Sequence, residues 1–356
     1  MAIKEILGFD DFPEASRRPT IELLGKGLYP ASNPGVSSIN NSVMSYDDRK
    51  WLRVTGVTNP YLVMRLVANK IYTLEEVKTK KLWFGFRYVI DNNLSGSSSS
   101  YYLCQLYFQG PNSSVNPILK TDMQRPTDEV YIEILIDIAG GKVDSYMDGA
   151  FVRSLSIADM DITKLSDVQI YYGQMSNAHS SENHLYNDFY WIADTKGEDA
   201  FPSDRLGPVK VKSVTIAGTV LPEDWTLSDP SSNADAILSP STMSPTGERS
   251  PVVRTSPSES VASVGFAKPA AELSIKAVSI EVFGFRDTGT APTLQAQLKQ
   301  GLTLGEKLSF SVPTLEYNRG GKSDRMGCLN RDLDGKEWTN ERIDSLEVLV
   351  NSKTGG

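Results

Sequence analysis

Four oxygen-bearing side chains near the C-terminus have a spacing that could bind calcium. Asn330, Asp332 and Asp334 alternate along the chain, Gly335 follows at once, and Glu341 lies six residues beyond that glycine. Calcium loops use this order, because alternate side-chain oxygens and a terminal glutamate surround the ion while a glycine permits the tight turn. The pattern makes a calcium loop one hypothesis for this segment.

The residues around this segment favour a different interpretation. Residues 320–329 do not form a helical pattern, and Glu337 stands where an apolar residue normally pairs two calcium loops. We expect an acidic turn that leads into a short helix, with Thr339 or Asn340 as its N-cap and Trp338 packed on a sheet. We therefore predict no metal ion and no other cofactor, and keep the calcium loop as the alternative.

The two histidines are a second place to look for chemistry. His179 and His184 lie five residues apart in a segment rich in serine and asparagine. A zinc site needs further ligands, and a serine triad needs a nucleophile and an acid beside the imidazole. The sequence indicates neither, so we expect both histidines in a solvent-exposed loop.

Paired carboxylates would be needed for glycoside hydrolysis. Glu129, Glu133 and Asp137 share one face of an expected strand, spaced by four residues. Successive members would lie about 13 Å apart on a strand. A retaining glycosidase holds its two carboxyl groups at about 5 Å. We predict no catalytic residues and a protein that is not an enzyme.

Sugar binding without catalysis needs only aromatic platforms and a few polar groups. Tyr171, Tyr172 and Trp191 could stack on a sugar ring. Core or interface packing is the favoured interpretation for these side chains, because large aromatic rings dominate the energetics of cores and interfaces.

Short strand patterns occupy most of the first two hundred residues. Any such site would have to be positioned by these strands. A single helical pattern, at 72–80, interrupts them. The clearest hairpin signal is an alternating strand that ends in Asp148-Gly149. Regular short strands with turns between them predict an all-β, two-sheet sandwich. The expected strands are 82–90, 101–108, 130–138, 142–149, 151–155 and 168–173.

The segment after these strands predicts a domain boundary. Asn187-Asp188 suits a turn, and the aromatic residues behind it suit a strand. Residues 194–204 then collect acids, Gly197 and Pro202, which favours a linker. We predict a jelly roll over 1–200 and a second β-sandwich over 201–356.

The second domain is expected to open with a strand at 209–216. Residues 228–260 are rich in proline and serine, which predicts a long surface loop without central strands. Four further strand patterns follow that loop, at 273–285, 293–299, 308–312 and 345–350.

Composition limits the partners. The 356 residues include 36 Lys plus Arg and 44 Asp plus Glu, a net charge of -8. Nucleic-acid affinity depends on basic side chains that neutralise phosphates, so we predict no nucleic-acid partner. No apolar run approaches the roughly 20 residues of a membrane span, and no secretory signal is visible. We predict synthesis in a cytoplasm, no membrane contact, and free thiols at Cys104 and Cys328.

Several different short motifs follow one another in a definite order along the chain. Those of the N-terminal part are Gly8-Phe9-Asp10-Asp11-Phe12, Arg49-Lys50-Trp51, Trp83-Phe84-Gly85-Phe86, Tyr131-Ile132-Glu133-Ile134, residues 143–149, Asn187-Asp188-Phe189-Tyr190-Trp191 and residues 205–211. Those of the C-terminal part are Trp225, Asn233-Ala234-Asp235, Ile275-Lys276-Ala277-Val278, Glu337-Trp338-Thr339 and Leu346-Glu347-Val348. Together these motifs resemble a family of tailed-bacteriophage virion proteins with an N-terminal laminin-G/concanavalin A-like jelly roll.

The resemblance covers essentially the whole chain and implies a non-enzymatic structural component of the virion. It implies a tail, neck collar, baseplate or decoration protein, assembled in the host bacterial cytoplasm. Its partners would be other copies of itself and other virion proteins. The alternative is a host-receptor or carbohydrate-binding module on the virion, with a host surface glycan as its partner.

Overall fold

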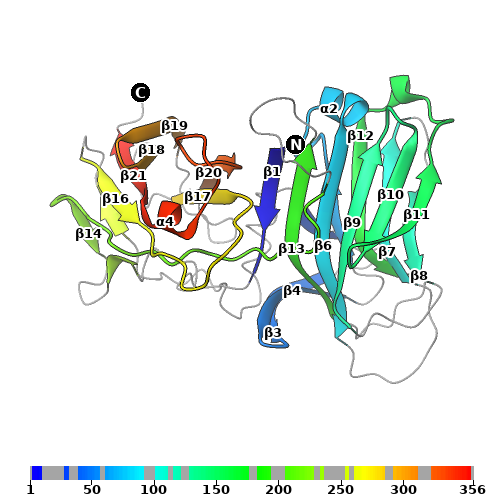
Figure 1. Cartoon of the computed structure of the whole chain (residues 1–356), viewed down its shortest axis with the longest axis horizontal. Coiled ribbons are helices and arrows are strands. Elements are labelled where there is room, and N and C mark those ends of the chain that lie inside the picture. The colour runs from blue at the N-terminus through cyan, green and yellow to red at the C-terminus, as the bar shows by residue number, and fades with distance from the viewer. Residues whose placement is uncertain are drawn as a thin grey trace. The chain divides into compact units, whose positions relative to one another are not determined.

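The regular structure of the described residues in the computed structural model is almost all antiparallel strand, so the all-β prediction is confirmed (Figure 1). The chain divides into two compact units, one of residues 1–10 and 14–212 and the other of residues 11–13 and 213–356. The structure describes residues 2–9, 28–31, 39–56, 61–91, 101–110, 115–121, 128–175, 183–193, 205–227, 233–235, 253–255, 260–284, 292–311 and 322–353.

The larger sheet of the first unit has eight strands. Its order along the sheet is β11-β10-β9-β6-β13-β4-β3, and β1 (Ala2–Leu7) also pairs with β13. The other strands are β3 (Ile39–Tyr46), β4 (Arg49–Gly56), β6 (Lys81–Asp91), β9 (Val130–Asp137), β10 (Lys142–Met147), β11 (Ala150–Ser156) and β13 (Asn183–Ala193).

The second sheet of this unit has five strands, in the order β2-β5-β12-β7-β8. They are β2 (Leu28–Ala31), β5 (Tyr61–Arg65), β7 (Tyr101–Gln109), β8 (Val115–Thr121) and β12 (Asp167–Met175). Neighbouring strands far apart in sequence, such as β5 and β12, give the crossed connections of a jelly roll.

Aromatic side chains hold the two sheets together. Tyr172 of β12 meets the rings of Phe84 and Phe86 at centroid distances of 5.9 and 4.9 Å. Phe189 stacks on Trp191 at 5.6 Å. All these rings are buried. Because strand side chains alternate between faces, Phe84, Phe86 and their neighbours define the inner face of the large sheet.

Local signals in the sequence act as expected in this unit. Asp148 and Gly149 both have positive φ, 49° and 83°, as a two-residue hairpin turn between β10 and β11 requires. Helix α2 (Leu74–Thr79) begins after Thr73, whose side chain forms a capping box with Glu76. The described helices, which also include the 3₁₀ turn η1 (Ile162–Lys164) and α4 (Asn340–Asp344), are all too short to cross a membrane.

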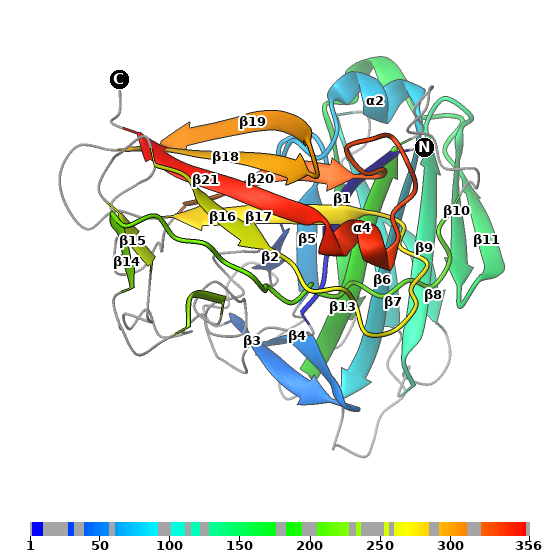
Figure 2. The ribbon, with the colours of Figure 1, turned by 60° about the vertical axis from the view of Figure 1, so that its left-hand side comes forward.

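The second unit contains a four-stranded sheet in the order β16-β21-β18-β19 (Figure 2). Two strand pairs, β17 with β20 and β14 with β15, complete it. The strands are β14 (Trp225–Leu227), β15 (Val253–Thr255), β16 (Ala262–Gly265), β17 (Val278–Gly284), β18 (Thr293–Gln300), β19 (Thr303–Ser311), β20 (Lys322–Leu329) and β21 (Leu346–Lys353).

The core of the second unit joins β17 to the four-stranded sheet. Ile280 of β17 belongs to one apolar cluster with Leu298 of β18, Val348 of β21 and Ile343 of α4. Trp338 packs in the same cluster, as the sequence predicts.

Two strand predictions differ from the structure. Residues 209–216 are not a strand, apart from an isolated bridge between Ile216 and Phe266, because residues up to 212 belong to the first unit. Within 228–260, β15 pairs with β14 in a two-stranded pair, so the described residues there include no central strand, as predicted, but they are not a loop throughout. The rest of that predicted loop lies outside the described residues, except for 233–235 and Ser260.

Candidate functional site

The residues of the hypothetical calcium loop form an acidic turn. One carboxylate oxygen of Asp332 accepts hydrogen bonds from the amides of Asp334 (3.0 Å) and Lys336 (2.6 Å). The other oxygen forms an ion pair with Arg342, so a guanidinium takes the position beside the carboxylate that a cation would need. The Thr303 hydroxyl donates to Asp334 at 2.8 Å.

Glu341 and Asn330 have other places. The Glu341 carboxylate lies 2.7 Å from the Lys268 ammonium, whose hydrogen bond lowers the pKa of Glu341 to about 2. Asn330 follows the end of β20. Helix α4 begins after Thr339, whose hydroxyl accepts from the Arg342 amide, so the capping prediction is confirmed. In the described part of the chain, no three or more His, Cys, Asp or Glu side chains are grouped for a metal ion.

The prediction of a solvent-exposed loop is wrong for His184. This residue is the second of β13, it is fully buried, and its ring lies beside Tyr88 on the inner face. The Tyr88 hydroxyl lies 2.7 Å from His184 Nδ1. Burial lowers the pKa of His184 to about 4, so the imidazole is neutral at neutral pH. His179 lies outside the described residues.

Glu129, just before β9, and Glu133 and Asp137, within β9, have partners inside the fold. Glu129 forms an ion pair with Arg87, and Asp137 accepts from the Gly140 amide at 2.7 Å. Glu133 is fully buried. The Glu133 carboxylate is therefore part of the fold's internal hydrogen bonding.

The suggested sugar-stacking aromatics are not surface platforms. Tyr172 and Trp191 are fully buried, and the Trp191 indole N–H donates to the Tyr172 hydroxyl at 3.2 Å. Tyr171 is half-buried, with its hydroxyl 3.0 Å from the Gln169 side chain. The core interpretation is confirmed for Tyr172 and Trp191.

Asn187 and Asp188 lie inside β13, so the prediction that they close a turn is wrong. Asp188 has a φ of 52°, and the register of β13 against β6 shifts between Asn187 and Tyr190. An extra residue of this kind makes a β-bulge rather than a chain reversal. On the opposite edge of β13, β4 pairs with residues 184–186 and β1 with residues 189–193. The bulge therefore lies where two strands meet end to end along one edge.

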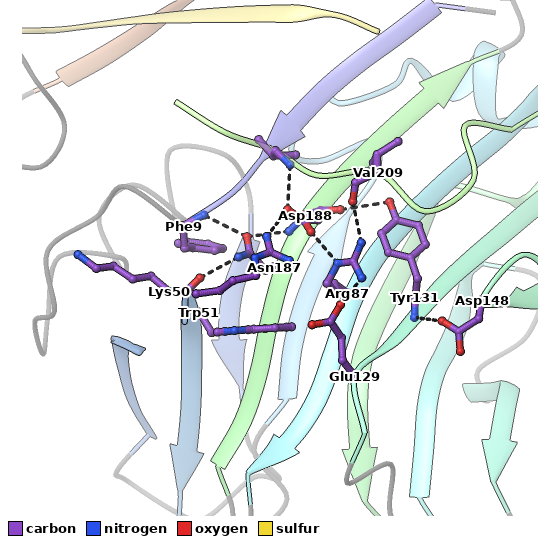
Figure 3. A network of polar contacts seen from close by, with 12 residues as sticks. Phe9, Lys50, Trp51, Arg87, Glu129, Tyr131, Asp148, Asn187, Asp188 and Val209 are labelled. Carbon is purple, nitrogen blue, oxygen red and sulfur yellow. Dashed lines mark hydrogen bonds and ion pairs between the residues drawn. The ribbon is translucent and has the colours of Figure 1, made fainter. Parts of the chain in front are cut away.

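The fully buried Asp188 carboxylate is the centre of a polar network (Figure 3). Its Oδ2 accepts from Arg87 Nε at 2.7 Å, and its Oδ1 lies 3.0 Å from Arg49 Nη2. The amide of Val211 donates to the same Oδ1 at 2.8 Å. Arg49 begins β4 and Arg87 lies in β6, so one carboxylate joins three separate parts of the unit.

Asn187 extends this network to the N-terminal segment. Its Oδ1 accepts from the amides of Phe9 (3.1 Å) and Asp188 (2.8 Å). Its amide nitrogen donates to the Lys50 carbonyl at 2.8 Å. The two adjacent side chains thus satisfy backbone groups of β4 and of the chain beyond β1, which a bulged strand cannot do through its own ladder.

Residues 205–211, which we call the strap, cross the outer face of the large sheet. The Arg205 guanidinium lies 4.4 Å from the centre of the Tyr146 ring and donates to the Gly149 carbonyl. The Gly207 amide donates to Glu133 at 2.9 Å. Further along, the Val209 carbonyl accepts from Arg87 at 3.0 Å. These contacts explain why the first unit continues to residue 212.

Glu133 is the second anchor of the strap. The Tyr190 hydroxyl donates to it at 2.6 Å, and burial together with the charge of Glu133 holds the pKa of Tyr190 well above its ordinary value. Gly85 separates Tyr190 from Glu133 in the strand register. A Cβ on Gly85 would lie 2.4 Å from the Tyr190 ring, so only glycine lets the ring cross to the carboxylate.

The network has the chemistry of a structural site. Its central carboxylate is buried and accepts hydrogen bonds from Arg49, Arg87 and the Val211 amide. The motifs that follow one another in order along the sequence supply most of its members, including Phe9, Lys50, Asn187-Asp188 and the strap. Sequence reasoning missed Arg87, although a lone charge in the middle of an aromatic strand was the available signal.

Comparisons with known proteins leave the family open, since no family model and no curated protein matches the chain. Among solved structures, the chain is similar to the CBM22-1 xylan-binding domain of Paenibacillus barcinonensis Xyn10C (TM-score 0.30, 10% identity, 55% of this chain and 96% of that one). It is also similar to alginate lyase Aly36B (TM-score 0.37, 6% identity, 55% and 100%). A third is lectin I of Ulex europaeus (TM-score 0.31, 10% identity, 53% and 98%). Likenesses at these scores carry no argument about function.

The buried histidine should make stability fall in acid. The unfolded histidine has a pKa of about 6.5, against about 4 in the folded chain. Between these values the unfolded chain binds more protons, so stability should fall as the pH drops through this window, by on the order of 3 kcal/mol. Denaturant unfolding at pH 7, 5.5 and 4 should show a shallower fall for His184→Gln than for the wild type. Parallel curves for the two proteins would contradict the expected role of His184.

Loss of the central carboxylate should be costly. Asp188→Asn leaves Arg49 and Arg87 buried without their shared anion, so the free energy of unfolding should fall by about 3 to 5 kcal/mol. Glu129→Gln is the matched control, because it removes a partly exposed partner of the same Arg87 and should cost about 1 kcal/mol or less. Urea denaturation of both variants measures the difference, and equal losses would show that Asp188 is not the centre of the network.

Proposed function

We propose that this chain is a non-catalytic structural component of a tailed-phage virion, and that it assembles through protein–protein contacts. Its partners would be other copies of itself and other virion proteins. The proposal rests on one observation: the buried acids of this chain hold strands and backbone amides in place.

The buried acids that could have served catalysis have such partners in each case. Asp188 is shared by Arg49 and Arg87, and Glu133 by Tyr190 and the strap. Asp167, at the start of β12, accepts from Arg65 at 3.0 Å and from the Val67 amide at 2.9 Å. A general acid or base needs a proton it can exchange with substrate, and groups enclosed in this way support a structural role instead.

Apolar side chains left in water support a role in contact. Phe151 and Val152 of β11 are 58% and 41% exposed. Leu302, in the turn between β18 and β19, is 101% exposed, and Leu304, in β19, is 55% exposed. Exposed aromatic and aliphatic groups of this kind can serve as anchors when a partner covers them. The sequence resemblance described above supports a virion as the place of assembly.

The assembly proposal is tested on phage particles. Mass spectrometry of purified virions should detect the chain, and its absence would overturn the proposal. Phe151→Asp and Leu302→Asp should leave the melting temperature almost unchanged, because surface substitutions rarely cost more than about 0.5 kcal/mol. Both should lower incorporation into particles, whereas Ala150→Asp, which adds the same charge to β11, should not. Normal incorporation of both variants would exclude these anchors.

A second candidate function is glycan binding, and one surface feature favours it. The exposed Phe151 ring meets Tyr146 edge-on at 5.5 Å, and Tyr146 is covered by the Arg205 guanidinium. An exposed ring beside a tyrosine and an arginine can stack on a sugar and donate hydrogen bonds to its hydroxyl groups. Tyr172 and Trp191 cannot do this, because both are buried.

A glycan array on the purified chain tests this second function. Saturable binding that Phe151→Ala abolishes and Leu302→Ala retains would favour a receptor-binding role. The absence of binding to any glycan would leave the structural role as the proposal.

A further inference from the structure

Two of the places where the chain leaves the first unit are held by neighbouring side chains. The first unit ends its N-terminal segment at Asp10 and its long segment at Lys212. One residue before each of these points, a backbone amide is bound to β13. The Phe9 amide donates to Asn187, and the Val211 amide donates to Asp188.

The two segments also touch each other. A Cβ placed on Gly8 would lie 2.8 Å from both Cβ and the carbonyl oxygen of Val211. Glycine at position 8 therefore lets the chain beyond β1 pass against the end of the strap. The Asp188 backbone amide donates to Asn187 Oδ1, so the Asn187 side chain is fixed to the backbone that carries Asp188.

The anchors are supported from several strands. Asp188 is held by Arg49 of β4 and Arg87 of β6, and Asn187 by the Lys50 carbonyl of β4. A displacement of either chain segment must therefore disturb the same buried groups. Because a buried, partly satisfied polar network is strongly unfavourable, the network is expected to be either complete or open.

We propose that Asn187 and Asp188 couple the two exits of the first unit, so that the segment around Phe9 and the strap open and close together as one clasp. With a clasp of this kind, a force or movement of either segment acts on both segments. The inference does not depend on the proposed virion role.

The test follows hydrogen exchange of the full chain by mass spectrometry, with proline substitutions that each delete one anchoring amide. Phe9→Pro also removes a buried ring, so it is compared with Phe9→Ala, which keeps the amide. Val211→Pro should raise exchange in the strap and also in the peptide that contains β1 and Phe9. Phe9→Pro should raise exchange in its own peptide and also in the strap. Coupling between two sites is reciprocal. Loss of one buried hydrogen bond corresponds to about tenfold faster local opening, and to more at Val211, where the acceptor is a carboxylate.

Asp167→Asn is the matched control for a general loss of stability. Asp167 is likewise a buried carboxylate with an arginine and backbone amides as partners, but these belong to β5 and the turn that follows it. Its substitution should speed exchange there and leave the strap and the β1 peptide no faster than the rest of the unit. Independent responses, in which each proline variant affects only its own segment, would overturn the coupling. So would an equal response in the strap to Asp167→Asn.

Discussion

The first unit depends on the hydrogen bonds that the buried Asp188 carboxylate accepts. A charge removed from water is tolerated only when its partners surround it, and here they come from β4, from β6 and from the strap. The carboxylate has the position it has because a bulge turns it out of the ladder of β13. That bulge lies where β4 ends its pairing with β13 and β1 begins, so the same dipeptide closes the break in the sheet edge.

The strap explains why the central strands of the large sheet are buried on both faces. Its inner face packs on the second sheet through Phe84, Phe86 and Tyr172. On the outer face, Glu133 and Tyr190 would be exposed without the strap, whose Gly207 amide and Arg205 guanidinium satisfy Glu133. The strap has no ladder partner and is held by side chains. Its binding therefore depends on a few charged groups rather than on a run of backbone hydrogen bonds.

The different roles of the buried polar groups and of the exposed apolar groups bear on function. Acids and the buried imidazole, which in many folds would form a reactive site, serve in this chain to fix strands, turns and a chain exit. The groups left for contact with other molecules are on edges and turns, such as Phe151 on β11 and Leu302 between β18 and β19. The function proposed for the chain rests on this use of its buried acids and on these exposed side chains.

The sequence by itself determined the features that depend on neighbouring residues. It determined the β class, the Asp148-Gly149 hairpin, the short helix near residues 72–80 and the acidic turn before α4, since each follows from local backbone preferences. Only the tertiary structure decided the roles of Asn187, Asp188, His184 and the strap. Local preference favours a turn at Asn-Asp and an exposed loop at His184, but pairing of β13 with β4, β6 and β1 overrides both. The partners of Asp188 lie 23 to 139 residues away along the chain, beyond any local pattern, and their convergence is a property of the folded sheets.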